Sequence, residues 1–205
     1  MPPLSQHAIV HQSFAVIDRE IGAHELTPKA YAVVRRVIHS TADFEFKHLI
    51  RFSPGAIAAG MNALRQQVPI ITDVTMVQQG IQGMVERTFQ NPLIAAIAQE
   101  IEPQPGKTRT ELGMLKSLAQ YPQAIVVIGN APTALLALCD AIAAGQAHPS
   151  LVIGAPVGFI AVEDSKRALA QTAVPQIRVD GRKGGSGVAA AMLNALTVLA
   201  WEALP

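Results

Sequence analysis

Three strand–loop–helix units follow one another in the second half of the chain, and this succession constrains the fold more than any other feature. Each unit opens with a short apolar run typical of a buried strand: AIVVIG (124–129), SLVIG (150–154) and QIRVD (176–180). A loop and then a helical stretch follow each run, with helices predicted to end at Gly145, to span about 162–171 and to extend from Val188 to about Ala203. Right-handed crossovers between such strands predict an α/β fold, in which a mainly parallel sheet is flanked by helices.

The loops after these strands form the expected ligand site. In a parallel sheet they lie together at the carboxyl ends of the strands, where ligands bind, so GNAPT, APVGF and GRKGGSG are expected to converge. In GRKGGSG, the glycines Gly184, Gly185 and Gly187 leave backbone N–H groups uncovered at a helix start, beside Arg182 and Lys183. This arrangement suits an anion, although glycine and proline at such junctions also serve as ordinary turn residues. Because the common nucleotide-binding glycine motifs do not fit, a carboxylate ligand is favoured over a nucleotide.

The first half of the chain is predicted to add helices and one short strand to the same domain. A helix is expected over about residues 5–21, and Ser53-Pro54 marks the start of another that continues to about Gln67. The strand PIITD (69–73) and a helix from near Val74 follow. No repeat, low-complexity tract or linker divides the sequence, so residues 1–205 are expected to form a single domain.

His39 lies within RRVIHSTADFEFK (35–47), in the last turn of a helix for which Thr27 is the predicted cap and Pro28 the first residue. A helix C-terminus favours a protonated imidazole, and Asp43 or Glu45 is expected to raise the pKa of His39 further. His39 is therefore a candidate proton donor near neutral pH. The same position also describes a polar residue that only closes a helix, and spacing alone does not separate the two hypotheses.

A second candidate anion-binding segment is KTRTELGMLK (107–116). Thr108 and Glu111 have the spacing of a capping box, which places Arg109 in the first turn of a helix. A cation there opposes the helix macrodipole at a cost of about 0.3–1 kcal/mol. An anionic ligand would offset this cost; alternatively, Arg109 points into water or pairs with a surface acid.

Composition excludes several classes of function. The formal net charge is +1, without a basic block or aromatic ladder, so a nucleic-acid partner is set aside. The N-terminus lacks the features of a signal peptide, and the apolar stretches are shorter than the ~20 residues of a membrane span, so we expect a soluble, cytoplasmic protein. His7 and His11 stand at i, i+4 without a third ligand, and no metal site is predicted. Cys139, the single cysteine, is expected to be a buried, inert thiol.

Six motifs together carry a family resemblance. In chain order they are RRVIHSTADFEF, TDVTMVQQGI (72–81), KTRTELGM (107–114), VVIGNAPTALL (126–136), VIGAPVGFIAVEDSK (152–166) and DGRKGGSGVAAAMLNAL (180–196). They resemble precorrin-8X methylmutase, also called precorrin isomerase, of the cobalamin pathway, over most of the chain and in the family's order. Each motif is weak alone, but the set is specific.

The resemblance implies a reaction: the 1,5-shift of a methyl group from C-11 to C-12 of precorrin-8X or cobalt-precorrin-8, giving hydrogenobyrinic or cobyrinic acid without a cofactor. His39 falls where the family's catalytic histidine stands, and the implied role is general acid. The substrate is a large, flat ring with several carboxylates, which accounts for anion sites on different loops. The expected substrate-binding residues are Ser13, Thr75, Arg109, Asn130, Ala131, Thr133, Lys183, Gly184, Gly185 and Ser186.

The resemblance also implies a homodimer with sites that can be shared between subunits. The apolar helix 188–203 is compatible with subunit packing and equally with an ordinary core helix. Lys183 leans weakly toward the cobalt-containing substrate. Two alternatives are a tetrapyrrole carrier that binds the same ring without converting it, and a nucleotide-dependent α/β enzyme that uses GRKGGSG as a phosphate loop.

Overall fold

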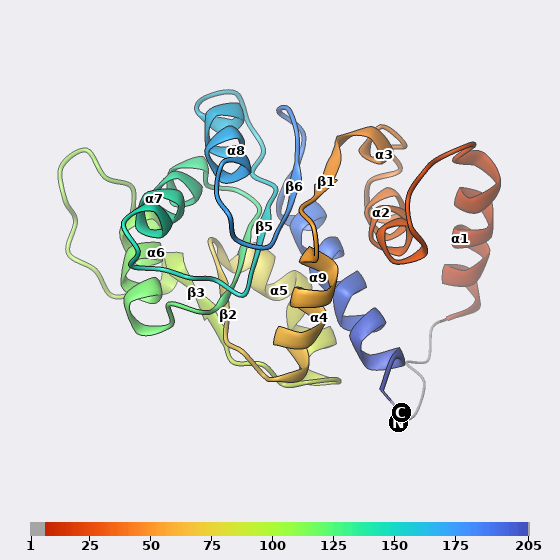
Figure 1. Ribbon diagram of the computed structural model, residues 1–205, viewed down its shortest axis with the longest axis horizontal. Helices are drawn as coiled ribbons and strands as arrows, with labels where there is room; N and C mark the ends of the chain where they lie inside the picture. Colours follow the sequence, from red (N-terminus) through yellow and green to blue (C-terminus); the bar gives the residue numbers. More distant parts are fainter. Residues whose placement is uncertain (1–6, 205) are drawn as a thin grey trace.

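One six-stranded sheet organises the part of the chain that the computed structural model describes, residues 7–204 (Figure 1). Its strand order is β1-β6-β5-β4-β2-β3, and the bounds are Ile50–Phe52 (β1), Ile70–Thr72 (β2), Leu93–Ala95 (β3), Ile125–Ile128 (β4), Leu151–Gly154 (β5) and Gln176–Val179 (β6). All neighbouring pairs are parallel except β1 with β6. The prediction of a mainly parallel α/β fold is confirmed.

Helices cover both faces of this sheet. The helices α1 (Ala8–Glu20), α2 (Pro28–Thr41), α4 (Ala56–Arg65), α5 (Thr75–Glu86) and α9 (Ser186–Glu202) lie on one side, with α1 outside α2. On the other side lie α6 (Arg109–Gln120), α7 (Pro132–Ala143) and α8 (Val162–Ala170). Two short turns, α3 (Phe46–Leu49) and the 3-10 helix η1 (Ala96–Ala98), complete the described elements.

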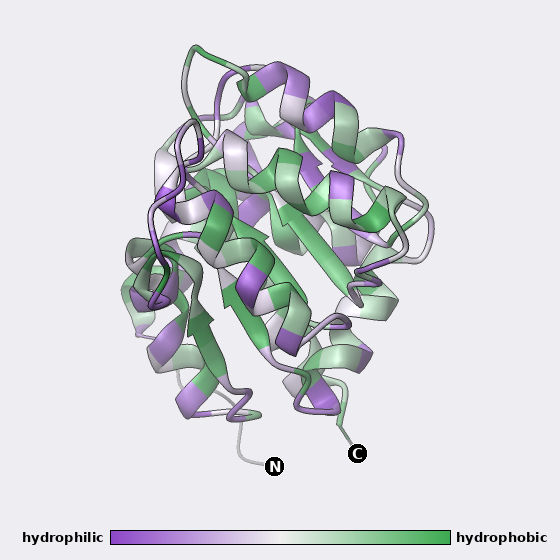
Figure 2. Cartoon of the chain, turned by 90° about the vertical axis from the view of Figure 1, so that its left-hand side faces the viewer, coloured by the Kyte–Doolittle hydropathy of each residue, from purple (hydrophilic) through white to green (hydrophobic). Residues whose placement is uncertain are grey.

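Alternation along the strands divides the core into two layers. In β4, Ile125 and Val127 pack with α2, α4, α5 and α9, whereas Val126 and Ile128 pack with α6, α7 and α8. Successive side chains of a strand point to opposite faces, so a strand buried on both sides must be apolar throughout. Figure 2 shows this pattern as largely hydrophobic central strands between helices that carry hydrophilic residues on their outer sides.

Helix α9 is the central helix of the larger layer. It packs against α5, α2 and α4, and its buried residues occupy all sides of the helix. Close approach to α5 depends on Gly80, where a Cβ would lie 2.8 Å from the Cβ of Ala190. Of the two interpretations of this apolar helix, the core helix is confirmed. No helix within residues 7–204 is both long and apolar enough to cross a lipid bilayer.

Several local predictions about the first half need correction. Residues 5 and 6 of the predicted first helix lie outside the described residues, and the described helix begins at Ala8. Ser53 does not cap a helix: its Oγ accepts a hydrogen bond from the N–H of Gln176, and α4 begins at Ala56 after Gly55. The strands β1 and β3 were not predicted; each has three residues and lies at an edge of the sheet.

The chain reverses direction across the sheet between β2 and β4. After β2 it passes through α5 to β3 on one side, and it then returns to place β4 on the other side of β2. In open α/β sheets, such a switch point opens a crevice at the carboxyl ends of the strands. The loops that follow β2 and β4 therefore border the expected ligand site.

Candidate active site

The three glycine-containing loops meet, as the sequence predicts. A Cβ at Gly129, in the loop after β4, would lie 2.7 Å from the Cα of Ser186 at the start of α9. Gly184 packs against the carbonyl oxygen of Ala155, in the loop after β5, and the N–H of Gly185 donates to the same oxygen at 2.8 Å. The N–H of Gly185 was predicted to be uncovered, so that detail is wrong.

Asp73, immediately after β2, organises the loop after β4. Its buried carboxylate accepts hydrogen bonds from the N–H groups of Gly129 at 3.1 Å, and of Asn130 and Ala131 at 2.7 Å each. Burial raises the pKa of Asp73, and the backbone donors act in the opposite direction. Sequence reasoning missed this residue, although an acid directly after a buried strand at a switch point is a usable signal.

Lys166 on α8 fixes the glycine loop, here residues 181–185. It is 2% exposed, and its Nζ donates to the carbonyl oxygens of Gly181 at 2.6 Å and of Lys183 at 2.7 Å. Burial lowers the pKa of Lys166 to about 8, against smaller opposite effects of Asp180 and Glu163. Local sequence patterns do not single out this lysine, because its partners are backbone atoms of a distant segment.

Lys183 ties the glycine loop to the turn after α2. Its Nζ lies 2.5 Å from Oδ2 of Asp43 and 2.6 Å from Oε2 of Glu45. These hydrogen bonds raise the pKa of Lys183 and lower that of Asp43. The side chain was predicted to bind substrate; in the described structure it pairs with the two acids that were expected to act on His39.

His39 stands in the last turn of α2, as predicted, half-buried with its ring edge-on to Phe14 of α1 at 5.2 Å between centroids. The pKa of His39 is lowered, first by burial and second by the charge of Arg36. The expectation that Asp43 and Glu45 raise this pKa is wrong, because both acids are paired with Lys183. The helix dipole acts on the exposed end of a helix, whereas here burial and a nearby cation dominate.

Arg109 is the first residue of α6, and the capping box of Thr108 and Glu111 is confirmed. Its Nε donates to the carbonyl oxygen of Ile97 at 2.9 Å, and its side chain lines a cavity of about 330 Å³ together with Lys107. Neither water alone nor a surface acid accounts for its position. A hydroxyl contact of 2.8 Å between Thr108 and Thr133 joins this helix start to the loop after β4.

Uncapped helix starts add further anion-binding capacity. In the described structure no side chain caps α5, α7 or α9, each of which begins where a parallel strand ends. Thr75 and Asn130 are exposed at these starts, Ala131 is buried, and Ser186 is half-buried. Free N–H groups and the positive end of the helix dipole favour carboxylates at such positions.

Ser13 lies on α1 next to Phe14, and its Oγ donates to the carbonyl oxygen of Ile9 at 2.8 Å. The hydroxyl oxygen remains an acceptor. Ser13 is thus adjacent in sequence to the residue that contacts His39.

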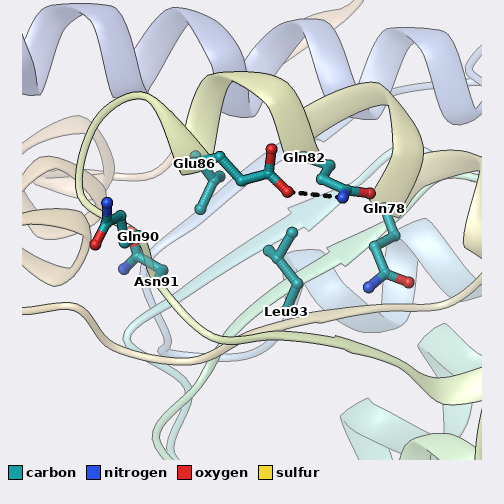
Figure 3. A pocket seen from close by; sticks show the side chains of 7 residues that line it. Gln78, Gln82, Glu86, Gln90, Asn91 and Leu93 are labelled. Carbon is teal, nitrogen blue, oxygen red and sulfur yellow. Dashed lines mark hydrogen bonds between the residues drawn. The ribbon is translucent and has the colours of Figure 1, made fainter.

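A separate cavity of about 430 Å³ lies along the C-terminal half of α5 and the start of β3 (Figure 3). In this view the amide of Gln82 points toward Glu86, to which it donates at 2.7 Å. The lining residues are Gln78, Gln82, Val85, Glu86, Gln90, Asn91 and Leu93. None of these described residues belongs to the predicted site, which lies at the carboxyl ends of the strands.

The site therefore has two sides joined by the glycine loop. On one side Phe14 packs against His39, and Lys183 pairs with Asp43 in the turn after the same helix. On the other side Thr108, next to Arg109, contacts Thr133 in the loop after β4. A half-buried imidazole beside several separated anion-binding groups can transfer a proton to a large ligand that carries carboxylates at its rim.

Comparisons with known proteins agree with this geometry. The family model described as precorrin-8X methylmutase matches residues 8–199. A cobalt-precorrin-8 methylmutase of Synechocystis is 56% identical over 216 residues, covering 98% of this chain and 99% of that protein. A precorrin-8X methylmutase of Pseudomonas aeruginosa is 37% identical over 198 residues, covering 92% and 93%.

A solved structure agrees as well. The crystal structure of a precorrin-8X methylmutase from Thermus thermophilus has a TM-score of 0.87 and 42% sequence identity, with 96% of this chain and 98% of that chain covered. Both sequence and fold thus match over nearly the full length. The chain belongs to the precorrin-8X methylmutase family, whose members are isomerases that move a methyl group.

Proposed function

We propose that the protein catalyses the 1,5-shift of a methyl group from C-11 to C-12 of a precorrin-8 macrocycle, with His39 as general acid. The observation that carries this proposal is the position of His39, which is half-buried at the end of α2. The ion pair between Lys183 and Asp43 connects the turn after this helix to the glycine loop. A proton donor fixed beside the binding loops can protonate the bound ring. Protonation polarises the ring and lowers the barrier to migration. A positioned proton donor typically raises the rate by about 10²–10⁴-fold.

The proton is not consumed in this reaction. His39 takes it from solvent, delivers it to the macrocycle and regains one when the rearranged ring is deprotonated. Because the pKa of His39 is lowered in the free protein, the imidazole is mainly neutral at pH 7 before substrate binds. The negative charge of the substrate carboxylates acts in the opposite direction and favours the protonated form.

The carboxylates of the ring are assigned to groups on both sides of the site. Arg109 offers a planar guanidinium beside a cavity, a shape that suits carboxylates. The starts of α5, α7 and α9 offer free N–H groups at Thr75, Thr133 and Ser186. Asn130 offers its exposed side chain instead, because the N–H groups of Asn130 and Ala131 donate to Asp73. Lys183 binds a carboxylate in exchange for Asp43 and Glu45, and Ser13 contributes a hydroxyl near His39.

The cobalt-containing ring is the preferred substrate in this proposal. The relative at 56% identity is named for cobalt-precorrin-8, whereas one at 37% is named for precorrin-8X. The cobalt is part of the substrate. The chain would also act as a homodimer, and three exposed apolar side chains near the site, Met76, Phe159 and Ile160, support a subunit contact there. Sedimentation of the purified protein at several concentrations would test this state.

The deciding experiment compares wild type, His39→Ala and His148→Ala. Each is incubated with precorrin-8X and with cobalt-precorrin-8; absorption spectra follow conversion, and NMR identifies the product. His148 is exposed before β5, at the amino ends of the strands, and serves as the matched control. We expect conversion by wild type and His148→Ala, and binding without conversion by His39→Ala. Conversion by His39→Ala would refute the general-acid role, and binding without conversion by wild type would indicate a carrier.

A further inference from the structure

Two neighbouring arginines on α2 differ sharply in their surroundings. Arg35 is paired with Asp18 of α1 at 3.0 Å, and its guanidinium lies over the rings of Phe14 at 4.3 Å and Tyr31 at 5.5 Å. Arg36 is equally half-buried, yet it has no hydrogen bond or ion pair with any described residue. Burial lowers the pKa of Arg36, so its guanidinium is partly desolvated without a protein acceptor to offset the cost.

Arg36 also lies on the same side of α2 as His39. The two residues are separated by three positions, which places them one turn apart on neighbouring positions of a helix surface. They are close enough for the charge of Arg36 to act on the imidazole. The unpaired cation is therefore next to the proposed proton donor, whereas Arg35 turns toward α1.

Charged groups on the elements that pack against this part of α2 have partners, including Lys47 of α3, whose Nζ donates to the carbonyl oxygen of Ile21 at 2.8 Å. Asp18 of α1 pairs with Arg35 and accepts from Tyr31, and Asp43 and Glu45, in the turn before α3, pair with Lys183. Helix α9, which packs against α2, has no titratable side chain before Glu202. Within the described part of the chain, Arg36 is the unpaired charge that faces His39.

We propose that Arg36 is a substrate-binding residue whose guanidinium pairs with a side-chain carboxylate of the ring, and that this pairing allows His39 to take up the proton it delivers. The inference rests on the proposed function and deepens it. Before binding, the unpaired cation disfavours a second positive charge on the imidazole. A carboxylate on Arg36 neutralises that effect, so the acid becomes charged when substrate is present. Without substrate, the uncharged imidazole of His39 therefore does not act as a proton donor to water.

The test measures two quantities in wild type, Arg36→Met and Arg36→Lys. The first is the dissociation constant of hydrogenobyrinic acid, the metal-free product. The second is the pKa of His39 from NMR titration of the ring, with and without that ligand. Arg35→Met is the matched control: it removes a cation of the same helix that already has a partner.

In Arg36→Met, product affinity should fall by about 10- to 100-fold, as expected for the loss of a charge-assisted hydrogen-bonded pair. The pKa of His39 without ligand should rise toward its ordinary value, because the positive charge next to the imidazole is removed. In wild type, ligand should raise this pKa. Arg36→Lys should keep the low pKa of the free protein, because it keeps the charge, but should bind product more weakly, because it lacks the planar fork. Arg35→Met should lower the Tm and keep product affinity.

Unchanged product affinity in Arg36→Met, or a His39 titration that does not respond to the substitution, would overturn the assignment. If Arg36→Met does not fold, Arg36→Lys decides, since wild-type affinity in that variant contradicts bidentate pairing of Arg36 with a carboxylate. The titration of His39 in the unliganded protein does not depend on turnover. Failure of wild type to convert either substrate would therefore refute the proposed function. The effect of Arg36 on the pKa of His39 would still be measured independently, by the titration of the unliganded protein.

Discussion

Gly129 and Ser186 are packed so closely that no side chain fits between them: a Cβ at Gly129 would lie 2.7 Å from the Cα of Ser186. Gly129 directly follows β4 and Ser186 begins α9, so this contact joins the loop after β4 to the start of the helix that follows the glycine loop. The relative position of the two anion-binding helix starts, α7 and α9, is thereby fixed by backbone packing.

Gly129→Ala should separate these two loops. The new Cβ would also meet Cγ2 of Val77 at 2.8 Å, and overpacking of this kind typically costs about 1–3 kcal/mol. Chemical denaturation should show the loss of stability, together with weaker product binding. The control is Gly83→Ala on α5, where a Cβ meets nothing within 4 Å. It should stabilise the helix by roughly 0.5–1 kcal/mol. Equal stability of both variants would contradict the close contact.

Asp73→Asn should disorganise the loop after β4. An amide keeps one acceptor oxygen and turns donors toward backbone N–H groups, so at least one of the three hydrogen bonds is lost. We expect a loss of roughly 2–4 kcal/mol in the free energy of unfolding. Asp140→Asn, at an exposed position of α7, is the matched control and should change stability little. Asp73→Asn with wild-type stability would show that the loop is held by other contacts.

Lys166→Met should release the carbonyl oxygens of Gly181 and Lys183, raise the KM and leave the fold intact. The pKa of Lys166 is lowered to about 8 from 10.5. Between these values the unfolded chain binds the proton and the folded chain does not, so this group's contribution to stability grows as pH rises. The advantage of wild type over the variant should increase by up to about 3 kcal/mol across that window. Tm values at pH 7.5 and pH 10 would test the sign.

The contacts of Lys183 should depend on pH in the opposite way. Hydrogen bonding to Lys183 lowers the pKa of Asp43. The folded carboxylate therefore contributes stability above its ordinary pKa, and this contribution is lost as pH falls through the lowered value. The difference in Tm between wild type and Lys183→Met should be present at pH 7 and shrink in acid. A difference that persists in acid after the carboxylate is protonated would assign the stabilisation to packing of the lysine stem.

Repeating local patterns made the sheet and many helix ends predictable. Apolar runs of β-branched residues gave β4, β5 and β6, and Thr27-Pro28 and the capping box of Thr108 fixed the starts of α2 and α6. These signals are local, because a cap or a buried strand depends on neighbours in the chain. Ser53 shows the limit of such signals. Serine is a common helix cap, but the hydroxyl oxygen of Ser53 accepts a hydrogen bond from the N–H of Gln176 in β6, 123 residues away.

The sequence by itself determined the α/β class, the meeting of the three loops and the place of His39 at the end of α2. Only the tertiary structure decided the electrostatic environment of that histidine, and with it the pKa of the imidazole. Asp43 and Glu45 are its neighbours in sequence, yet Lys183, far along the chain, binds both, and burial together with Arg36 sets the pKa of His39. Likewise, Asp73 and Lys166 act on backbone atoms of distant loops. Desolvation and long-range ion pairs depend on the folded arrangement of distant segments, which local spacing does not encode.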